Sequence, residues 1–432
     1  MLPAHKIRAS PNHGPYLFHN RVLRVAVGGV DLALELVRSP SRSPLTANPG
    51  KILVCNQAHI GDVIWASSAL PVLRAAFPQA KIGFLVHPAS TVVLAGNPYV
   101  EWVHTLEHWK LNRRRTPFLQ KLKSHLRSRS RAIREVKDVG YDLAIDLYPY
   151  FPNSIPLLFT ARVPLRLGWT SGGFGGLLTH ALDWEDAHEH MVDCHKKLLA
   201  TILACRKHTE LARPELYCSK AISEKWGKVM AEHNIPGVYV TFHIGVGAVH
   251  RRWPEENWRK LAKLCLDSGW SIVLLGHGED EEKACTRIAH LSDAIFDLSG
   301  KLTWPLMAEA IGRSRLLVGL ESASSHIAAA RDVRAVCIYS GISHPSIWRP
   351  FHPAARVLVH PTPCSPCNLP RGCEGMECVR LTSPQAVFAH VQSLMAVSSF
   401  PGNSSHSHEL LGTPSPIRSP RAASWPQDGG SP

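Results

Sequence analysis

The stretch KILVCNQAHIGDVIWASSALPVLRAAFPQAKIGFLV, residues 51–86, decides the fold. Residues 51–55 and 81–86 are short apolar runs of the kind that form buried strands. Between them, residues 63–77 carry apolar side chains at helical spacing until Pro78 ends the pattern. A strand, a helix and a second strand in this order form a β-α-β unit, so the two strands are expected to lie parallel in one sheet.

The alternation of strands and helices continues on both sides of a polar, helical stretch at residues 191–234. The predicted strands before it are residues 100–106 and 141–147, and those after it are residues 237–244, 271–276, 294–298, 315–319 and 335–339. This pattern predicts an α/β protein with two Rossmann-like, doubly wound domains facing a central cleft. Ligands of such folds bind at the carboxyl ends of the strands, so the loops that follow the strands hold the candidate site residues.

Composition and charge narrow the class of protein. The chain has 432 residues, enough for two or three domains, and its 45% hydrophobic and 19% charged residues are typical of a globular protein. A formal net charge of +14 predicts an anionic partner, which is nucleic acid, a membrane surface or an acidic substrate. Eleven cysteines without a secretory signal indicate a reducing cytoplasm and not a disulfide framework.

The two ends of the chain are not expected to carry chemistry. Within residues 1–50, the apolar run at 22–37 is interrupted by charged residues and is too short to span a bilayer. It predicts an amphipathic helix that either packs on the first domain or lies against a membrane. Residues 39–50 are typical of a linker, and residues 398–432, rich in Ser, Pro and Gly, are typical of a disordered tail.

The loop after the first predicted strand contains Gly61 and Asp62. Gly61 permits a tight turn, and Asp62 stands at the start of the next helix, where a carboxylate can cap free backbone N–H groups. Alternatively, Asp62 is a general base that projects from the carboxyl end of a strand. The residues by themselves leave both roles open.

The opening stretch resembles glycosyltransferase family 9, which contains the ADP-heptose:lipopolysaccharide heptosyltransferases. That family begins with a strand, a loop ending in Gly-Asp, a helix with a PALRALRxxFP-like sequence and a second strand, and the sequence GNPYV at residues 96–100 also matches. The resemblance covers residues 51 to about 395 and implies the GT-B fold, with an acceptor domain at 51–215 and a nucleotide-sugar domain at 216–397. It also implies that Asp62 deprotonates the acceptor hydroxyl.

A strongly basic stretch lies in the first predicted domain. From Lys110 to Lys137 there are eleven Lys or Arg residues and one acid, Glu135. The stretch is either a solvated helix surface or an electropositive wall that attracts an anionic acceptor, for which the lipopolysaccharide inner core is suited. Nucleic acid is not the expected partner, because no helix-turn-helix pattern, zinc-finger spacing or aromatic RNA-binding motif accompanies the charge.

The first loop of the second domain carries two glycines and two arginines. Gly245 and Gly247 let the backbone approach a phosphate closely, and the guanidinium groups of Arg251 and Arg252 can neutralise a departing diphosphate without a metal ion. Two arginines at a helix entry can also be a plain surface feature. The resemblance implies that Arg251 stabilises the leaving diphosphate, although many family members have Lys at this position.

Three further loops match donor-binding segments of the family. Glu279 corresponds to an acid that binds the nucleoside, and Leu302, in the sequence GKLT, corresponds to a turn beside the adenine. Glu279 is equally consistent with an acid at a helix start, and the neighbouring Thr303 with an N-cap. The sequence ESASSH at 321–326 corresponds to Asp-[Ser/Thr]-Gly-x-x-His, in which the acid holds sugar hydroxyls while the loop and His hold the diphosphate. The donor-binding candidates here are Glu321, Ser322, Ala323, Ser324, Ser325 and His326; Glu321 replaces the family's Asp and Ala323 its Gly.

Four cysteines follow a predicted strand at residues 356–360, within a Pro- and Gly-rich loop at 364–378: Cys364, Cys367, Cys373 and Cys378. Four thiols at short spacing can bind one structural zinc ion, or they can remain free or oxidisable. Similar loops occur in many family members, and a catalytic role is not expected.

The resulting hypothesis is inverting transfer of heptose from ADP-heptose to the lipopolysaccharide core, with no catalytic cofactor. It places the enzyme in the cytoplasm, in peripheral contact with the inner face of the cytoplasmic membrane. Two alternatives remain: transfer of another nucleotide sugar to a capsule or O-chain glycan, and a non-catalytic protein that binds a nucleotide sugar or a glycan.

Overall fold

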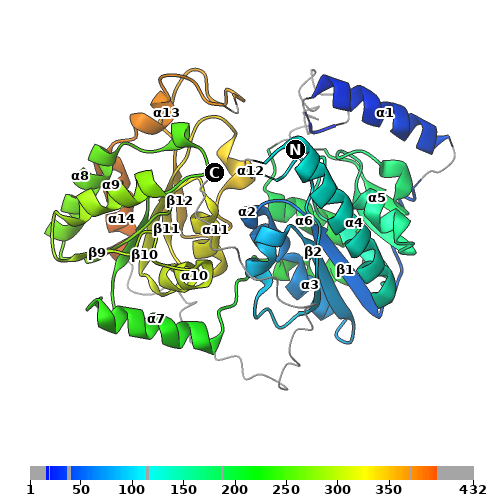
Figure 1. Cartoon of the computed structure of the whole chain (residues 1–432), viewed down its shortest axis with the longest axis horizontal. Coiled ribbons are helices and arrows are strands. Elements are labelled where there is room, and N and C mark those ends of the chain that lie inside the picture. Colours follow the sequence, from blue (N-terminus) through cyan, green and yellow to red (C-terminus); the bar gives the residue numbers. More distant parts are fainter. Residues whose placement is uncertain are drawn as a thin grey trace, which may run out of the picture. The chain divides into compact units, whose positions relative to one another are not determined.

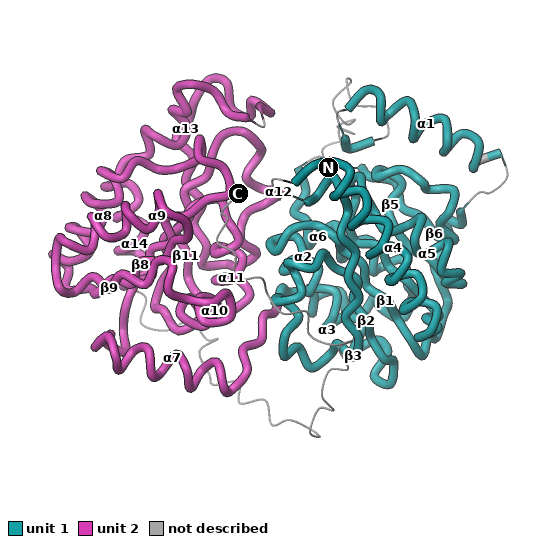
Figure 2. Tube along the Cα trace, viewed as in Figure 1, with its two compact units in different colours: residues 1–214, 414–432 teal, residues 215–413 magenta. Residues whose placement is uncertain are grey.

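The computed structural model describes residues 16–18, 20–36, 40–112, 116–185, 188–369 and 371–396. The chain divides into two compact units, unit 1 (residues 1–214 and 414–432) and unit 2 (residues 215–413), which Figure 2 distinguishes by colour. The predicted tail at 398–432 lies outside the described residues, as do residues 113–115 of the basic stretch.

Unit 1 is built on a six-stranded parallel sheet in the order β3-β2-β1-β4-β5-β6. Its strands are β1 (Lys51–Asn56), β2 (Lys81–Val86), β3 (Val100–Thr105), β4 (Leu143–Asp146), β5 (Leu165–Trp169) and β6 (His180–Leu182). As predicted, β1 and β2 pair in parallel, with Lys51 opposite Lys81. β5 and β6 are additional to the predicted strands.

Helices cover both faces of this sheet (Figure 1). They are α2 (Ile60–Ala66), α3 (Ala69–Ala76), α4 (Phe118–Val139), α5 (Ile155–Thr160) and α6 (Met191–Ala200), with the 3₁₀ helices η1 (Pro88–Leu94), η2 (Gly175–Leu177) and η3 (Leu203–Leu211). The single helix predicted at 63–77 is wrong in detail: it is interrupted at Ser67, whose hydroxyl donates to the carbonyl of Ile64 at 2.6 Å and competes with the backbone ladder.

The segment before β1 packs on unit 1. Helix α1 (Arg21–Glu35) contacts η2, where Val27 and Leu34 lie over Gly173 and Gly176. A Cβ atom at Gly176 would stand 2.7 Å from Cβ of Leu34, so the helix needs a glycine there. The predicted linker is an extended segment that forms parallel bridges from Ser41 to His180 of β6 and from Leu45 to Ile202.

Unit 2 repeats the same architecture with strand order β12-β11-β10-β7-β8-β9, all parallel. Its strands are β7 (Val240–His243), β8 (Ile272–Leu275), β9 (Ile295–Asp297), β10 (Leu316–Leu320), β11 (Ala335–Ile338) and β12 (Ala355–Leu358). Its helices are α7 (Lys220–Glu232), η4 (Val249–Arg251), α8 (Glu255–Asp267), α9 (Glu279–Ala289), α10 (Trp304–Arg313), α11 (Ala323–Ala330), α12 (Pro345–Trp348), α13 (Glu377–Arg380) and α14 (Pro384–Ala396).

The core of unit 2 forms where the helices α8, α9 and α14 pack on one face of the sheet. Trp258 of α8, Cys285 of α9 and Val391 of α14 are buried together with Phe242 of β7. Glu309 of α10 is fully buried, and it pairs with Arg313 and Arg331, at 2.9 and 2.8 Å. Two doubly wound parallel sheets in one chain confirm the predicted α/β fold class.

Among the residues described here, no helix has the length and apolar content needed to cross a membrane.

Candidate functional site

In unit 1, the loop between β1 and α2 is shaped by the last residue of the strand. Asn56 is buried, its Oδ1 accepts from the backbone N–H of Ala58 at 3.1 Å, and its Nδ2 donates to the carbonyl of Asp62 at 3.3 Å. The buried hydroxyl of Ser90, in η1, donates to the carbonyl of Ala58 at 3.1 Å. The loop is therefore held from both sides at the carboxyl edge of the sheet.

Asp62 is the third residue of α2 and is half-buried. Its Oδ2 accepts from the backbone N–H of His59 at 3.1 Å, so the carboxylate does cap the helix start. A carboxylate has about four lone-pair sites, so capping the helix and accepting a proton are compatible roles for one side chain. The catalytic assignment of Asp62 stays a prediction.

The loop after β4 brings three further titratable groups to the same edge. β4 is paired with β1, and burial, followed by the Asp62 carboxylate, raises the pKa of both Tyr148 and Tyr150. Asp146, at the end of β4, is buried and accepts from the backbone N–H groups of Ser154 at 2.5 Å and Tyr148 at 3.2 Å. Removal from water raises the pKa of Asp146 to about 7.

Asp146, Tyr148 and Tyr150 were not predicted as site residues. A signal for them exists, because they end or follow a strand that was predicted, at residues 141–147, and polar residues in that position are candidates in any doubly wound fold.

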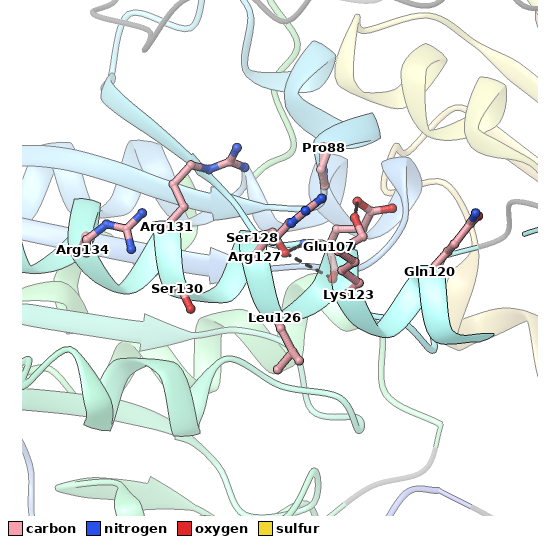
Figure 3. Close-up of a pocket in the computed structure, with 11 residues that line it drawn as sticks. Pro88, Glu107, Gln120, Lys123, Leu126, Arg127, Ser128, Ser130, Arg131 and Arg134 are labelled. Atoms are coloured by element: carbon pink, nitrogen blue, oxygen red, sulfur yellow. Dashed lines mark hydrogen bonds between the residues drawn. The ribbon is translucent and has the colours of Figure 1, made fainter. Parts of the chain in front are cut away.

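Helix α4 carries most of the described cations of the basic stretch and forms one wall of a groove of about 950 Å³ in unit 1 (Figure 3). Four cations line it at helical spacing: Lys123, Arg127, Arg131 and Arg134. The single acid in the lining is Glu107. Its carboxylate accepts hydrogen bonds from Ser124 Oγ at 2.5 Å and from Asn112 Nδ2 at 2.6 Å. The groove is therefore electropositive and suited to an anionic group.

In unit 2, two predicted site residues meet. Arg251, in η4 after β7, donates from Nη1 to Oε1 of Glu321, after β10, over 3.1 Å. The hydroxyl of Ser340, after β11, donates to Oε2 of Glu321 at 2.8 Å. β7 and β11 are the two neighbours of β10 in the sheet, so three adjacent strand ends are joined by one carboxylate. Ser340 was not predicted.

Arg251 keeps donors for a ligand. Its buried Nε has no hydrogen-bond acceptor among the described residues, and a guanidinium offers five N–H donors in all. Glu321 directly precedes Ser322, the N-cap of α11, where backbone N–H groups and the helix dipole favour an anion. Arg251 therefore lies beside a helix start that suits a diphosphate.

The small polar residues at the start of α11 are ordered by one another. Ser322 Oγ and Ser324 Oγ are 2.8 Å apart, and Ser325 Oγ donates to the carbonyl of Ser322 at 2.8 Å. Ser324, Ser325 and His326 are buried, while Ala323 is half-buried as the first residue of the helix. The predicted segment at 321–326 is thus one compact turn.

Arg252 and Gly245 lie against the first turn of α9, where Glu281 approaches both. Arg252 pairs with Asp280 at 3.1 Å and reaches Glu281 at 3.9 Å. A Cβ atom at Gly245 would stand 2.3 Å from Oε2 of Glu281. Gly245 therefore makes room for a carboxylate of its own unit, whereas Gly247 lies in the exposed part of the loop. Glu281 was not predicted as a site residue. Residues 279–282 are all acidic, and only the direction in which α9 points each side chain distinguishes Glu281 from its neighbours.

The two remaining donor-site candidates lie further out. Glu279, the first residue of α9, has a side chain that is 80% exposed and pairs with Lys283. Leu302 is half-buried and precedes Thr303, the N-cap residue of α10, whose side chain makes no capping hydrogen bond. The structure does not join either residue to the Arg251–Glu321 pair.

The four cysteines of the 364–378 loop are free thiols with different surroundings. Cys364 and Cys373 are exposed, Cys367 is half-buried and Cys378 is buried. Cys364 Sγ lies 3.5 Å from Thr362 Oγ1, and Cys373 Sγ accepts from the backbone N–H of Met376 at 3.4 Å. Among the residues that the structure describes, no three or more potential metal ligands lie grouped together.

The comparison with known families decides the assignment. The model of glycosyltransferase family 9 (heptosyltransferase) matches residues 129–374, more than half of the chain. The chain belongs to glycosyltransferase family 9. It is therefore a glycosyltransferase, as the resemblance of residues 51–86 predicted.

Curated relatives of this glycosyltransferase are similar over most of their length. Lipopolysaccharide heptosyltransferase 2 of Salmonella typhimurium is 27% identical over 323 residues, which are 71% of this chain and 87% of the relative. Lipopolysaccharide heptosyltransferase 1 of Pseudomonas aeruginosa is 24% identical over 330 residues, 73% of this chain and 86% of the relative.

Solved structures support the fold. The family 9 glycosyltransferase from Veillonella parvula superposes with a TM-score of 0.70 at 18% identity, covering 82% of this chain and 99% of its own. The ADP-heptose lipopolysaccharide heptosyltransferase II of E. coli gives 0.61 at 21% identity, covering 80% and 98%. These similarities confirm that the two sheets form the GT-B fold of this glycosyltransferase.

Proposed function

We propose that this glycosyltransferase transfers a heptose from ADP-heptose to the lipopolysaccharide core with inversion at the anomeric carbon. The observation that carries the proposal is the joining of Arg251, Glu321 and the start of α11 at three adjacent strand ends of unit 2. The heptosyltransferases among its relatives support the choice of sugar.

Unit 2 is proposed as the nucleotide-sugar domain. Arg251 neutralises the charge that develops on the departing ADP, with the backbone N–H groups at 322–324 as further donors. Glu321 orients the guanidinium and keeps lone pairs for sugar hydroxyls, since each of its oxygens has one protein partner at present. Gly245, Gly247, Arg252, Glu279, Leu302 and the 322–326 turn stay donor-site proposals.

Unit 1 is proposed as the acceptor domain, with Asp62 as the base. Asp62 lies at the carboxyl edge of the unit 1 sheet, where the ligands of doubly wound folds bind. The cationic groove along α4 suits the acidic sugars and phosphates of the core.

The proposed step is a direct displacement. The acceptor oxygen attacks the anomeric carbon and gives its proton to the Asp62 carboxylate. The bond from the anomeric carbon to the phosphate oxygen breaks, and its electron pair leaves on ADP, whose charge Arg251 stabilises. This scheme assigns no step to a metal ion.

A structural zinc ion at the cysteine loop remains a separate prediction, which rests on four thiols at short spacing. Metal analysis of the purified chain by mass spectrometry tests it. One zinc per chain would establish the site, and a clearly sub-stoichiometric amount would end the idea.

The test of the proposed function is a screen of nucleotide sugars by thermal shift, followed by transfer assays with a lipopolysaccharide-core acceptor. A donor that binds only the folded state raises the melting temperature. ADP-heptose is expected to give the largest rise and an inverted product by NMR. A larger rise with another nucleotide sugar would favour transfer to a different glycan, and binding without transfer to any acceptor would favour a non-catalytic protein.

A further inference from the structure

Helix α1 presents an apolar face to the outside of unit 1. Four of its large side chains are between 64% and 83% exposed: Val22, Val25, Leu32 and, at the C-cap, Leu36. Val30 is 46% exposed, and the remaining exposed residues of the helix are Arg21, Ala26, Gly29 and Ala33. Arg21 is the one polar residue on this face among the side chains that the structure describes.

The opposite face of α1 fixes the helix to unit 1. Val27 is buried against Gly173, and Leu34 lies on Gly176. Asp31 is buried on the same side, where its Oδ2 accepts from the hydroxyl of Tyr16 at 2.7 Å. The polar Asp31 therefore points inward, while Val22, Val25 and Leu32 point outward, which is unusual for a surface helix.

A run of aromatic contacts leads from Phe18, which precedes α1, to the start of α4. Ring centroids are 5.6 Å apart for Phe18 and Phe151, 5.9 Å for Phe151 and His108, and 5.6 Å for Trp109 and Phe118, and His108 and Trp109 are adjacent at 5.2 Å. Phe118 and Leu119 are themselves 56% and 76% exposed. The start of α4 thus adds exposed apolar groups to unit 1, at the far end of this run of ring contacts.

Cations accompany these apolar groups. Lys110 Nζ lies 5.0 Å from the ring of Phe151, and Lys123 and Arg127 follow within α4. Exposed Leu and Val side chains, an aromatic pair and flanking Lys and Arg residues are the combination found where a protein surface meets the headgroup region of an anionic bilayer.

We propose that the outward face of α1 inserts into the headgroup and acyl boundary of an anionic lipid bilayer, with the start of α4 as a second contact. At 15 residues, α1 extends for about 22 Å, which is too short to cross the hydrocarbon core, so the helix lies flat. Arg21 on the outward face of α1 and the cations before and within α4 favour an anionic surface over a neutral one.

The test is co-sedimentation of the full chain with vesicles, using phosphatidylglycerol mixed with phosphatidylethanolamine against pure phosphatidylcholine. The natural chain is expected to bind the anionic vesicles and to bind phosphatidylcholine much more weakly. The variant Val25→Glu with Leu32→Glu is expected to lower the partition coefficient about tenfold or more, because two exposed apolar groups no longer enter the bilayer.

The matched control is Val238→Glu with Leu381→Glu, in unit 2. It makes the same charge change at residues that are 66% and 53% exposed, and it is expected to bind vesicles almost as the natural chain does. Equal binding by the α1 variant, or no binding by the natural chain, would overturn the proposal. It would also fail if the α1 variant only abolished a concentration-dependent dimer, seen by analytical ultracentrifugation.

Discussion

Arg251 and Glu321 form an ion pair, with 3.1 Å between Nη1 of the guanidinium and Oε1 of the carboxylate. The pair spans 70 residues of sequence and joins the loops after two neighbouring strands, β7 and β10. In this glycosyltransferase the residue proposed to receive the diphosphate is therefore held in place before the donor arrives, which lowers the cost of organising the site.

Replacement of Arg251 by Ala is expected to lower kcat/KM about 100- to 1000-fold, since a preorganised donor to the leaving group is lost. The kcat/KM of Arg251→Lys should lie between those of Arg251→Ala and the natural chain, because an ammonium group keeps the charge but lacks the planar, bidentate geometry of a guanidinium. Steady-state assays with ADP-heptose measure this. The control Arg259→Ala removes a guanidinium from the surface of α8 and should leave the rate unchanged. Activity of Arg251→Ala within threefold of the natural chain would contradict the assignment.

Asp62→Asn is expected to lower kcat about 100- to 10,000-fold through loss of the general base. The amide keeps an oxygen that can accept from the backbone N–H of His59, so the melting temperature should change little. Calorimetric titration with ADP should give nearly the natural affinity. Near-normal turnover would refute the role, and Asp138→Asn on the surface of α4 serves as the control.

Charge reversal in the α4 groove should weaken the binding of the acceptor. Lys123→Glu with Arg127→Glu is expected to raise KM for a lipopolysaccharide-core acceptor about tenfold or more, to leave KM for the donor unchanged, and to weaken the dependence on salt. The matched variant Lys137→Glu with Lys228→Glu makes the same charge change outside the groove. If both variants raise KM equally, net charge and not the groove is responsible.

Asp146 predicts a dependence of stability on pH. An unfolded Asp has a pKa near 3.9, whereas burial raises the folded pKa to about 7, so between these values the folded chain holds a proton that the unfolded chain has lost. The Asp146 contribution to the free energy of unfolding is therefore full below about pH 4 and falls by up to about 1.4 kcal/mol per pH unit until about pH 7.

Urea unfolding of the natural chain and of Asp146→Asn at pH 5 and pH 7.5 measures this contribution. The variant should gain stability relative to the natural chain as the pH rises. A difference that stays constant with pH would show that Asp146 does not titrate in this window.

The glycine under α1 makes a prediction about packing. Gly176→Ala places a Cβ atom 2.7 Å from Leu34, so the helix must shift and lose burial, and hydrogen exchange across residues 21–36 should become faster. Gly29→Ala meets nothing within 4 Å and should slow exchange, since Ala favours a helix by about 1 kcal/mol over Gly. Equal exchange in the two variants would contradict this packing.

Much of the fold could be predicted because periodicity is a local property. The β-α-β unit at 51–86 has clear strand and helix spacing, and its parallel pairing is confirmed. β6 was missed because three residues, His180–Leu182, carry too little pattern, and their pairing with β5 decides their conformation. The break at Ser67 depends on a side-chain hydrogen bond that spacing cannot express.

The sequence was sufficient to predict several of the residues that belong to the candidate site. It was not sufficient to predict which of them contact one another. Arg251 and Glu321 were each found after a predicted strand, but their ion pair follows from the order β11-β10-β7, which no local pattern contains. Glu281 was missed because one turn of α9 presents four acids in succession, 279–282, and only the helix phase directs this one toward Gly245.

The extended segment before β1 has a consequence for any shortened form of the enzyme. Its backbone bonds to Thr179 and Ala181 run along β6, the outer strand of the unit 1 sheet, and Leu45 bonds to Thr201 and Leu203 in the same way. An uncovered outer strand is a template for intermolecular pairing. A chain that begins at Lys51 would keep all the proposed catalytic residues and yet expose this edge, so its failure would appear as aggregation during expression and not as lost chemistry.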